Sequence, residues 1–168
     1  MEFETVIRER YSARSYSDKK IEKEKLDKIL EAGRIAPTAK NMQPFKIFVV
    51  ESNEGIEKID KATNCRFNAP TVLLVCGEKD KTYCEMDVTI VTTHMMLEAT
   101  NIGIANLWVE LFDKEIVTKE FEIPEDLKPV CLLMLGYESE TCHPSRLHST
   151  RKTIKEIVEY KWFLIYKK

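Results

Sequence analysis

Glycine is scarce in this chain, and its five copies among 168 residues never form a Gly-x-Gly-x-x-Gly arrangement. In that arrangement the glycines let the backbone approach the pyrophosphate of a dinucleotide closely. The absence therefore argues against a Rossmann-type site for a nicotinamide dinucleotide or FAD. Internal repeats, low-complexity segments and linker-like stretches are also missing. This favours one domain spanning residues 1–168.

Cysteine occurs five times, an odd number, and no Cys-x-x-Cys pair is present. Cys76 and Cys131 lie in apolar runs and are expected to be small core residues. Cys142-His143, with His148 nearby, comes closest to a metal-binding pattern, but no second group of ligands follows at zinc spacing. We therefore predict reduced thiols and no metal site.

Long hydrophobic runs and blocks of one charge sign are missing as well. No uncharged apolar stretch is long enough to span a bilayer, and no long basic block indicates nucleic-acid binding. The N-terminus runs directly into charged residues, so we predict no signal peptide and a cytoplasmic location. With 43% hydrophobic and 32% charged residues at a net charge of −2, the composition is that of an ordinary folded protein.

Hydrophobic periodicity predicts alternating helices and strands. Helices are expected near 2–10, 22–34, 54–62, 83–102, 113–120 and 153–160, and strands near 46–51, 70–77, 104–109 and 130–137. The continuous apolar character of 70–77 suits a strand covered on both faces. The alternation predicts an α/β or α+β fold with a mixed sheet.

The segment 83–102 is ambiguous by local propensity. Its β-branched run Val88–Thr93 favours a strand, but the apolar window continues through Ala99 and ends at Gly103, which is too long for a strand. We predict one long, central helix. His94 lies within it and is expected to be a hydrogen-bonded core or interface residue.

Two prolines frame the segment Ala36–Phe45, which reads Ala-Pro-Thr-Ala-Lys-Asn-Met-Gln-Pro-Phe. Each proline fixes its own φ and disfavours the helical region for the residue before it. We expect a stiff loop between a helix and a strand, with hydroxyl, amide and backbone groups turned outward. Such a loop is either a plain connection or a ligand-binding segment held between rigid elements.

A second polar segment, Arg8–Tyr16, leaves the first predicted helix with three arginines and two serines. Guanidinium groups offer a phosphate charge and forked hydrogen bonds, and a hydroxyl serves its remaining lone pairs. Taken alone, such arginines are more often a solvated surface. The two segments together carry more information than either one.

Arg10-Tyr11-Ser12-Ala13-Arg14 and Pro37-Thr38-Ala39, with Asn41 and Gln43-Pro44, resemble the nitroreductase family of FMN-dependent oxidoreductases. That family typically carries an Arg-x-Ser-x-Arg-like opening and a Pro-Ser/Thr-x-x-Asn-x-Gln-Pro loop at a similar separation. The resemblance covers most of residues 3–160. It implies an α+β fold of α/β-type layers: a central mixed, mostly antiparallel sheet flanked by helices, with 83–102 as a long dimer helix.

The resemblance also implies a set of FMN-binding residues. Arg10, Ser12 and Arg14 would serve the phosphate and pyrimidine end, and Arg151 would meet the phosphate late in the chain. The backbone N–H of Glu110 would approach flavin N5. The full expected set is Arg10, Tyr11, Ser12, Arg14, Pro37, Thr38, Ala39, Asn41, Gln43, Trp108, Val109, Glu110, Leu111, Ser149 and Arg151, with Pro37, Thr38, Ala39 and Asn41 supplied by the other subunit.

Departures from the family pattern are visible at single positions. Leu111 replaces a frequent glycine and would crowd the ring or move the loop. Ser149 stands where some members have lysine, which weakens the phosphate site by one charge. Arg146 or Lys152 could substitute for Arg151 as the late phosphate contact.

By this resemblance the protein is an FMN-dependent NAD(P)H oxidoreductase and a homodimer with FMN at the subunit interface. Hydride would pass from NAD(P)H to the flavin and electrons on to a nitroaromatic, quinone or similar acceptor. No side chain is assigned as an acid or base, because the flavin supplies the chemistry. Alternatives are a flavin-binding or redox-sensing module, reductive dehalogenation and flavin cleavage.

Residues 160–168 are expected to form an ordered tail on their own chain or the partner.

Overall fold

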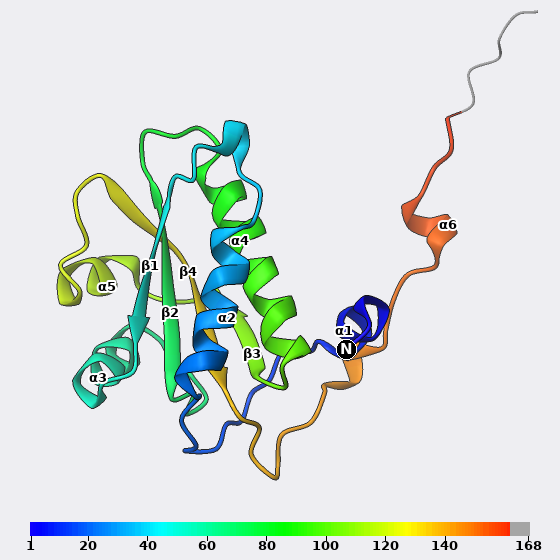
Figure 1. Ribbon diagram of the computed structural model, residues 1–168, viewed down its shortest axis with the longest axis horizontal. Coiled ribbons are helices and arrows are strands. Elements are labelled where there is room, and N and C mark those ends of the chain that lie inside the picture. Colours follow the sequence, from blue (N-terminus) through cyan, green and yellow to red (C-terminus); the bar gives the residue numbers. More distant parts are fainter. Residues whose placement is uncertain (162–168) are drawn as a thin grey trace, which may run out of the picture.

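The computed structural model describes residues 1–161 of the chain (Figure 1). The expected tail at 160–168 lies outside the described residues from 162 onward, and the single-domain organisation stays a prediction. None of the described helices is long and apolar enough to cross a membrane. The elements are α1 (Phe3–Glu9), α2 (Lys23–Arg34), η1 (Ala39–Asn41), β1 (Phe45–Val50), α3 (Asn53–Ala62), β2 (Thr71–Glu78), α4 (Cys84–Asn101), β3 (Ala105–Val109), α5 (Lys114–Glu120), β4 (Leu127–Gly136), η2 (Arg146–His148) and α6 (Ile154–Ile157).

The strands form one antiparallel sheet in the order β1-β2-β4-β3. Val72 of β2 lies opposite Val50 of β1 and Met134 of β4, so β2 is a central strand. Ser12 and Asn106 form an isolated parallel bridge, so the segment after α1 runs parallel to β3 at that edge of the sheet. The α+β class predicted from the sequence is confirmed.

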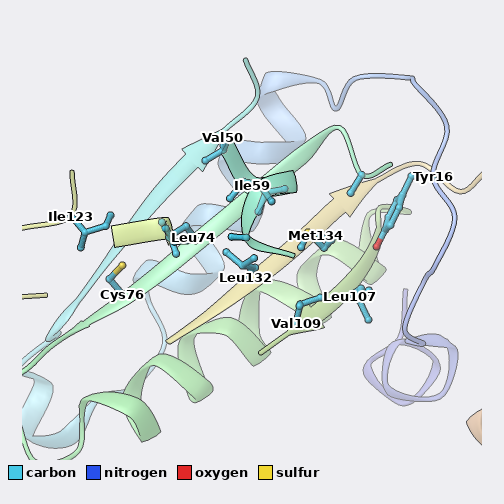
Figure 2. Packing of buried hydrophobic residues seen from close by; sticks show 14 of the residues in the cluster. Tyr16, Val50, Ile59, Leu74, Cys76, Leu107, Val109, Ile123, Leu132 and Met134 are labelled. Atoms are coloured by element: carbon cyan, nitrogen blue, oxygen red, sulfur yellow. The ribbon is translucent and has the colours of Figure 1, made fainter. Parts of the chain in front are cut away.

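Helices cover both faces of the sheet. Side chains of β2 alternate between the faces: Leu73 packs in a cluster with residues of α2 and α4, and Leu74 in a cluster with residues of α3 and α5. The second cluster is drawn in Figure 2, where Ile59 of α3 lies over Leu74 and Leu132. This explains the continuous apolar character of 70–77, because each face of that strand meets its own core.

Local sequence signals explain several helix ends. The Ser52 side chain accepts a hydrogen bond from the Gly55 N–H, and the Asp113 carboxylate accepts from Glu115 and Ile116, which caps α3 and α5. The long helix α4 ends at Asn101, and Gly103, just after its C-cap Ile102, has a φ of +74°, which favours glycine. The prediction of a helix, and not a strand, for the β-branched segment is therefore confirmed.

Three local expectations differ from the structure. The strand expected from 130 begins at Leu127 and includes Pro129. Proline has no N–H for the ladder, and the pairing of β2 with β4 shifts register between Val75 and Cys76, opposite this proline. The helix expected at 153–160 spans Ile154–Ile157 only. Gly33, expected with Pro37 to end the helix near 22–34, lies inside α2, where its missing side chain leaves room for α4 to approach.

Candidate functional site

The arginine–serine segment leaves α1 and runs beside β3. The Ala13 N–H donates to the Asn106 backbone oxygen at 3.0 Å. Asn106 is itself buried, and its side-chain amide donates to Thr100 Oγ1 at 3.0 Å and to the Met96 backbone oxygen at 3.2 Å. A buried amide on β3 therefore connects the segment to the C-terminal end of α4.

The two arginine-bearing ends of the sequence meet at one pocket. Its volume is about 220 Å³, and its lining includes Arg10, Ser12, Arg14 and Arg151 but no carboxylate. None of these arginines forms an ion pair with any residue in 1–161, whereas Arg8, Arg34 and Arg66 do. Among the described residues, Arg14 and Arg151 donate only to backbone oxygens. Guanidinium groups that lack a carboxylate partner and lie beside a hydroxyl suit an anionic ligand such as a phosphate. The remaining lining residues are Tyr11, Ser145, Leu147 and His148.

Tyr11 anchors the late loop against this segment. Its hydroxyl donates to Glu138 at 2.7 Å and lies 3.4 Å from the Cys142 sulfur, and its ring meets the edge of His148. Burial, followed by these two hydrogen bonds, raises the pKa of the Tyr11 phenol above its usual value. The phenol therefore stays neutral and holds the loop that carries Arg151 near Arg10.

A larger hollow of about 720 Å³ also has Tyr11 in its lining. Its lining mixes Arg8 with Glu9 and Glu138, so its charges largely offset one another. The smaller pocket is the better candidate for an anion, because its charged lining residues are all cationic.

The proline-framed loop is built differently from the outward-facing loop expected. The Thr38 hydroxyl accepts from the Gln43 N–H at 3.0 Å, and the Gln43 side chain donates to the Asn41 backbone oxygen at 3.2 Å. Lys40, Asn41 and Gln43 have positive φ of 52–53°. The Ala39 N–H donates to the buried Asp87 carboxylate at 2.8 Å.

The proline-framed loop and the arginine–serine segment lie at opposite ends of α4 (Figure 1). Asp87 contacts the loop near the start of the helix, and Thr100 bonds Asn106 near its end. At 1.5 Å per residue these contacts are about 20 Å apart. The two predicted halves of the cofactor site therefore do not meet within one chain.

The segment after β3 offers free backbone donors. Trp108 and Val109 pack on opposite faces of the sheet, and Phe112 is also a core residue. Glu110 and Leu111 are exposed, and their N–H groups donate no hydrogen bond to any residue in the described part of the chain. From Asn106 to Glu110 the strand rises about 13 Å, so a ligand meeting both the arginine pocket and these donors is elongated.

The histidines near this region bond to the backbone. The His94 ring nitrogen lies 2.9 Å from the Ile90 oxygen, within α4. His148 lies 3.1 Å from the Arg8 oxygen, and His143 lies 2.9 Å from the Thr141 oxygen. Within residues 1–161, no group of three His, Cys, Asp or Glu side chains is arranged to hold a metal ion.

The sequence model of the nitroreductase family matches residues 7–70 and 65–137. The chain belongs to the nitroreductase family. Among solved structures, a nitroreductase family protein from Clostridium difficile 630 is 43% identical, with a TM-score of 0.89 over 97% of this chain and 100% of that chain. A protein of Methanothermobacter thermautotrophicus with a provisional NADH dehydrogenase/NAD(P)H nitroreductase name is 29% identical over 159 residues, 84% of this chain and 83% of that protein.

A nitroreductase from Bacteroides fragilis NCTC 9343, solved with bound FMN, is 24% identical. Its TM-score is 0.78 over 96% of this chain and 100% of that chain. At this identity the likeness concerns the fold. The fold and the family expected from the two polar segments are therefore confirmed.

Sequence reasoning missed three residues that hold the predicted site in place. Asp87 and Asn106 are buried polar residues, and Asn106 stands in the otherwise apolar strand β3, a contrast that could have been noticed. Thr63 ends α3, and its hydroxyl donates to the Leu111 backbone oxygen at 2.7 Å. Nothing local distinguishes Thr63 from any other threonine beside a helix end, so only the tertiary contact identifies it.

Proposed function

We propose that this chain is an FMN-dependent NAD(P)H oxidoreductase that acts as a homodimer. The observation that carries this proposal is the pocket at which the unpaired guanidinium groups of Arg10, Arg14 and Arg151 meet Ser12. A phosphate monoester is dianionic near neutral pH and accepts several such hydrogen bonds. The pocket therefore suits the phosphate end of FMN.

The remaining predicted residues take roles along the elongated ligand. FMN, when bound, would accept a hydride from NAD(P)H and deliver two electrons to an electron-poor acceptor such as a nitroaromatic or a quinone. The free N–H of Glu110 would donate toward the reactive edge of the ring, and Leu111 would lie against it. Tyr11 and Ser149 would border the phosphate end, and Trp108 and Val109 would support the ring from β3. No acid or base is assigned.

The second subunit completes the site in this proposal. Within one chain the loop carrying Pro37, Thr38, Ala39, Asn41 and Gln43 lies at the far end of α4 from the arginine pocket. A second copy can bring its own loop to the pocket. Apolar side chains exposed on α1 and α4 support such an interface: Phe3 is 68% exposed and Met86 is 65% exposed.

An absorption spectrum of the purified protein, recorded before and after addition of FMN, tests this function. We expect flavin bands that stay with the protein through gel filtration, with about one FMN per chain. NAD(P)H oxidation with menadione or a nitrofuran as acceptor then tests turnover. Protein that stays colourless and ignores added FMN contradicts the proposal.

One observation favours a second candidate, a flavin-binding or redox-sensing module without efficient turnover. Leu111 is 79% exposed, at the position where a glycine is frequent in the family resemblance. A leucine there could occupy the space that a nicotinamide or an acceptor needs above the ring. Bound flavin without NAD(P)H oxidation would support this second candidate over the first.

A further inference from the structure

The end of α3 is joined to the loop after β3 by hydrogen bonds. The Thr63 hydroxyl donates to the Leu111 backbone oxygen at 2.7 Å and accepts from the Cys65 N–H at 3.1 Å. Beside it, the Asp113 N–H donates to the Ala62 oxygen at 2.9 Å. Thr63 is 8% exposed, so its hydroxyl is shielded from most competing water.

These bonds fix the orientation of one peptide group. The oxygen of the Leu111–Phe112 peptide bonds to Thr63, and its N–H donates to the Glu110 oxygen at 3.0 Å. The Glu110 oxygen is thereby directed toward Phe112. Since the Glu110–Leu111 peptide is trans, its N–H points the opposite way, away from this turn.

The adjacent N–H groups of Glu110 and Leu111 donate no hydrogen bond to any residue among 1–161. They lie in an exposed loop, where a backbone donor would ordinarily be free to change direction. A donor helps a reaction most when it is already oriented before the ligand arrives. For the Leu111 N–H, the Thr63 hydroxyl supplies that orientation from the neighbouring end of α3.

We propose that Thr63 is a positioning residue for this cofactor site. It touches neither ligand nor substrate, and acts by holding the Leu111 carbonyl so that the Leu111 N–H, next to the Glu110 N–H, points away from the turn and toward the flavin ring. The inference rests on the proposed function, and it adds the residue that follows α3, an element to which no part of the site has been assigned.

Thr63→Val removes the hydroxyl and keeps the shape of the side chain, while Thr63→Ser keeps the hydroxyl. In protein without FMN, amide exchange at Phe112 should be about tenfold faster in Thr63→Val, because its turn loses a supporting hydrogen bond. Thr63→Ser should exchange like the wild type. Thr118→Val is the matched control, since its hydroxyl donates to the Lys114 backbone oxygen within α5 and not to the segment Glu110–Phe112.

The flavin reduction potential gives the second measurement. If the backbone donors beside the ring are less well oriented, the ratio of the affinities for reduced and oxidised FMN should change about tenfold. For a two-electron couple this shifts the reduction potential by about 30 mV. We expect this shift in Thr63→Val and its absence in Thr63→Ser and Thr118→Val. Thr63→Ala serves as a second hydroxyl-free variant if Thr63→Val does not fold.

The outcomes separate this inference from the proposed function. Wild-type protein that binds no FMN overturns both. Wild-type protein that binds FMN, together with a Thr63→Val variant of unchanged Phe112 exchange and unchanged potential, overturns the role of Thr63 alone. A shift that appears equally in Thr63→Ser also overturns it, because the hydroxyl is then not the cause.

Discussion

Single residues decide whether the arginine pocket binds a phosphate. Arg10 and Arg151 come from nearly opposite ends of the sequence, and both line the pocket without an ion-pair partner among the described residues. The arginine–serine segment by itself made Arg10 a candidate, whereas Arg151 is expected only through the family resemblance. Their meeting depends on Tyr11, whose hydroxyl bonds to Glu138 at the start of the late loop.

Arg10→Ala and Arg151→Ala should each weaken FMN binding about tenfold to a hundredfold, because a charge-assisted hydrogen bond contributes about 1.5–3 kcal/mol. Fluorescence titration of FMN measures the affinity. Arg34→Ala is the control, since that guanidinium is paired with Glu31 on the surface of α2. If both pocket variants bind FMN as tightly as Arg34→Ala does, the phosphate lies elsewhere.

At the scale of elements, the long helix α4 supports the proline-framed loop. The buried Asp87 carboxylate accepts the Ala39 N–H at 2.8 Å. Three residues of the loop hold positive φ, which costs a residue other than glycine about 1–2 kcal/mol. Contacts with α4 therefore help the loop to keep a conformation that its sequence alone would not favour.

Asp87→Ala should lower the free energy of unfolding by about 1.5–3 kcal/mol, because the half-buried Ala39 N–H loses a charged acceptor. Asp87→Asn should retain most of the stability, since its amide oxygen can still accept that bond. Denaturant titration of the FMN-free protein measures both. An alanine variant as stable as the wild type would show that the loop does not depend on this contact.

Pattern and length predicted most elements but not their exact ends. The segment 83–102 was assigned to a helix by its length against its β-branched run, and α4 spans Cys84–Asn101. Pro129 was expected outside a strand, yet β4 includes it because a register shift removes the need for its N–H. Such a shift depends on the neighbouring strand, so local propensity does not predict it.

At the scale of the whole molecule, the separation of the two site halves makes the dimer necessary to the proposal. Ile90 and Met86 are one helical turn apart on α4, and both are exposed in the single chain. Burial of such a stripe against a second copy stabilises an interface by removing apolar surface from water.

Ile90→Lys should convert a dimer to a monomer and abolish stable FMN binding, while the helical content of each chain stays unchanged. A charge buried in an apolar interface typically costs several kcal/mol. Analytical ultracentrifugation gives the oligomeric state, and far-ultraviolet circular dichroism checks the fold. Thr118→Lys adds the same charge on α5, on the other face of the sheet, and should remain dimeric. Dimeric, FMN-binding Ile90→Lys would contradict an interface at this stripe.

The amino-acid sequence by itself determined the alternation of elements, the doubly covered strand β2 and, through two short polar segments, the family. Those features depend on local periodicity and on residues close together in the chain. Only the tertiary structure decided that Arg10 meets Arg151, that Asp87 holds the Ala39 loop, and that Thr63 bonds Leu111. These contacts join distant segments, and their partners are chosen by packing, which no local pattern encodes.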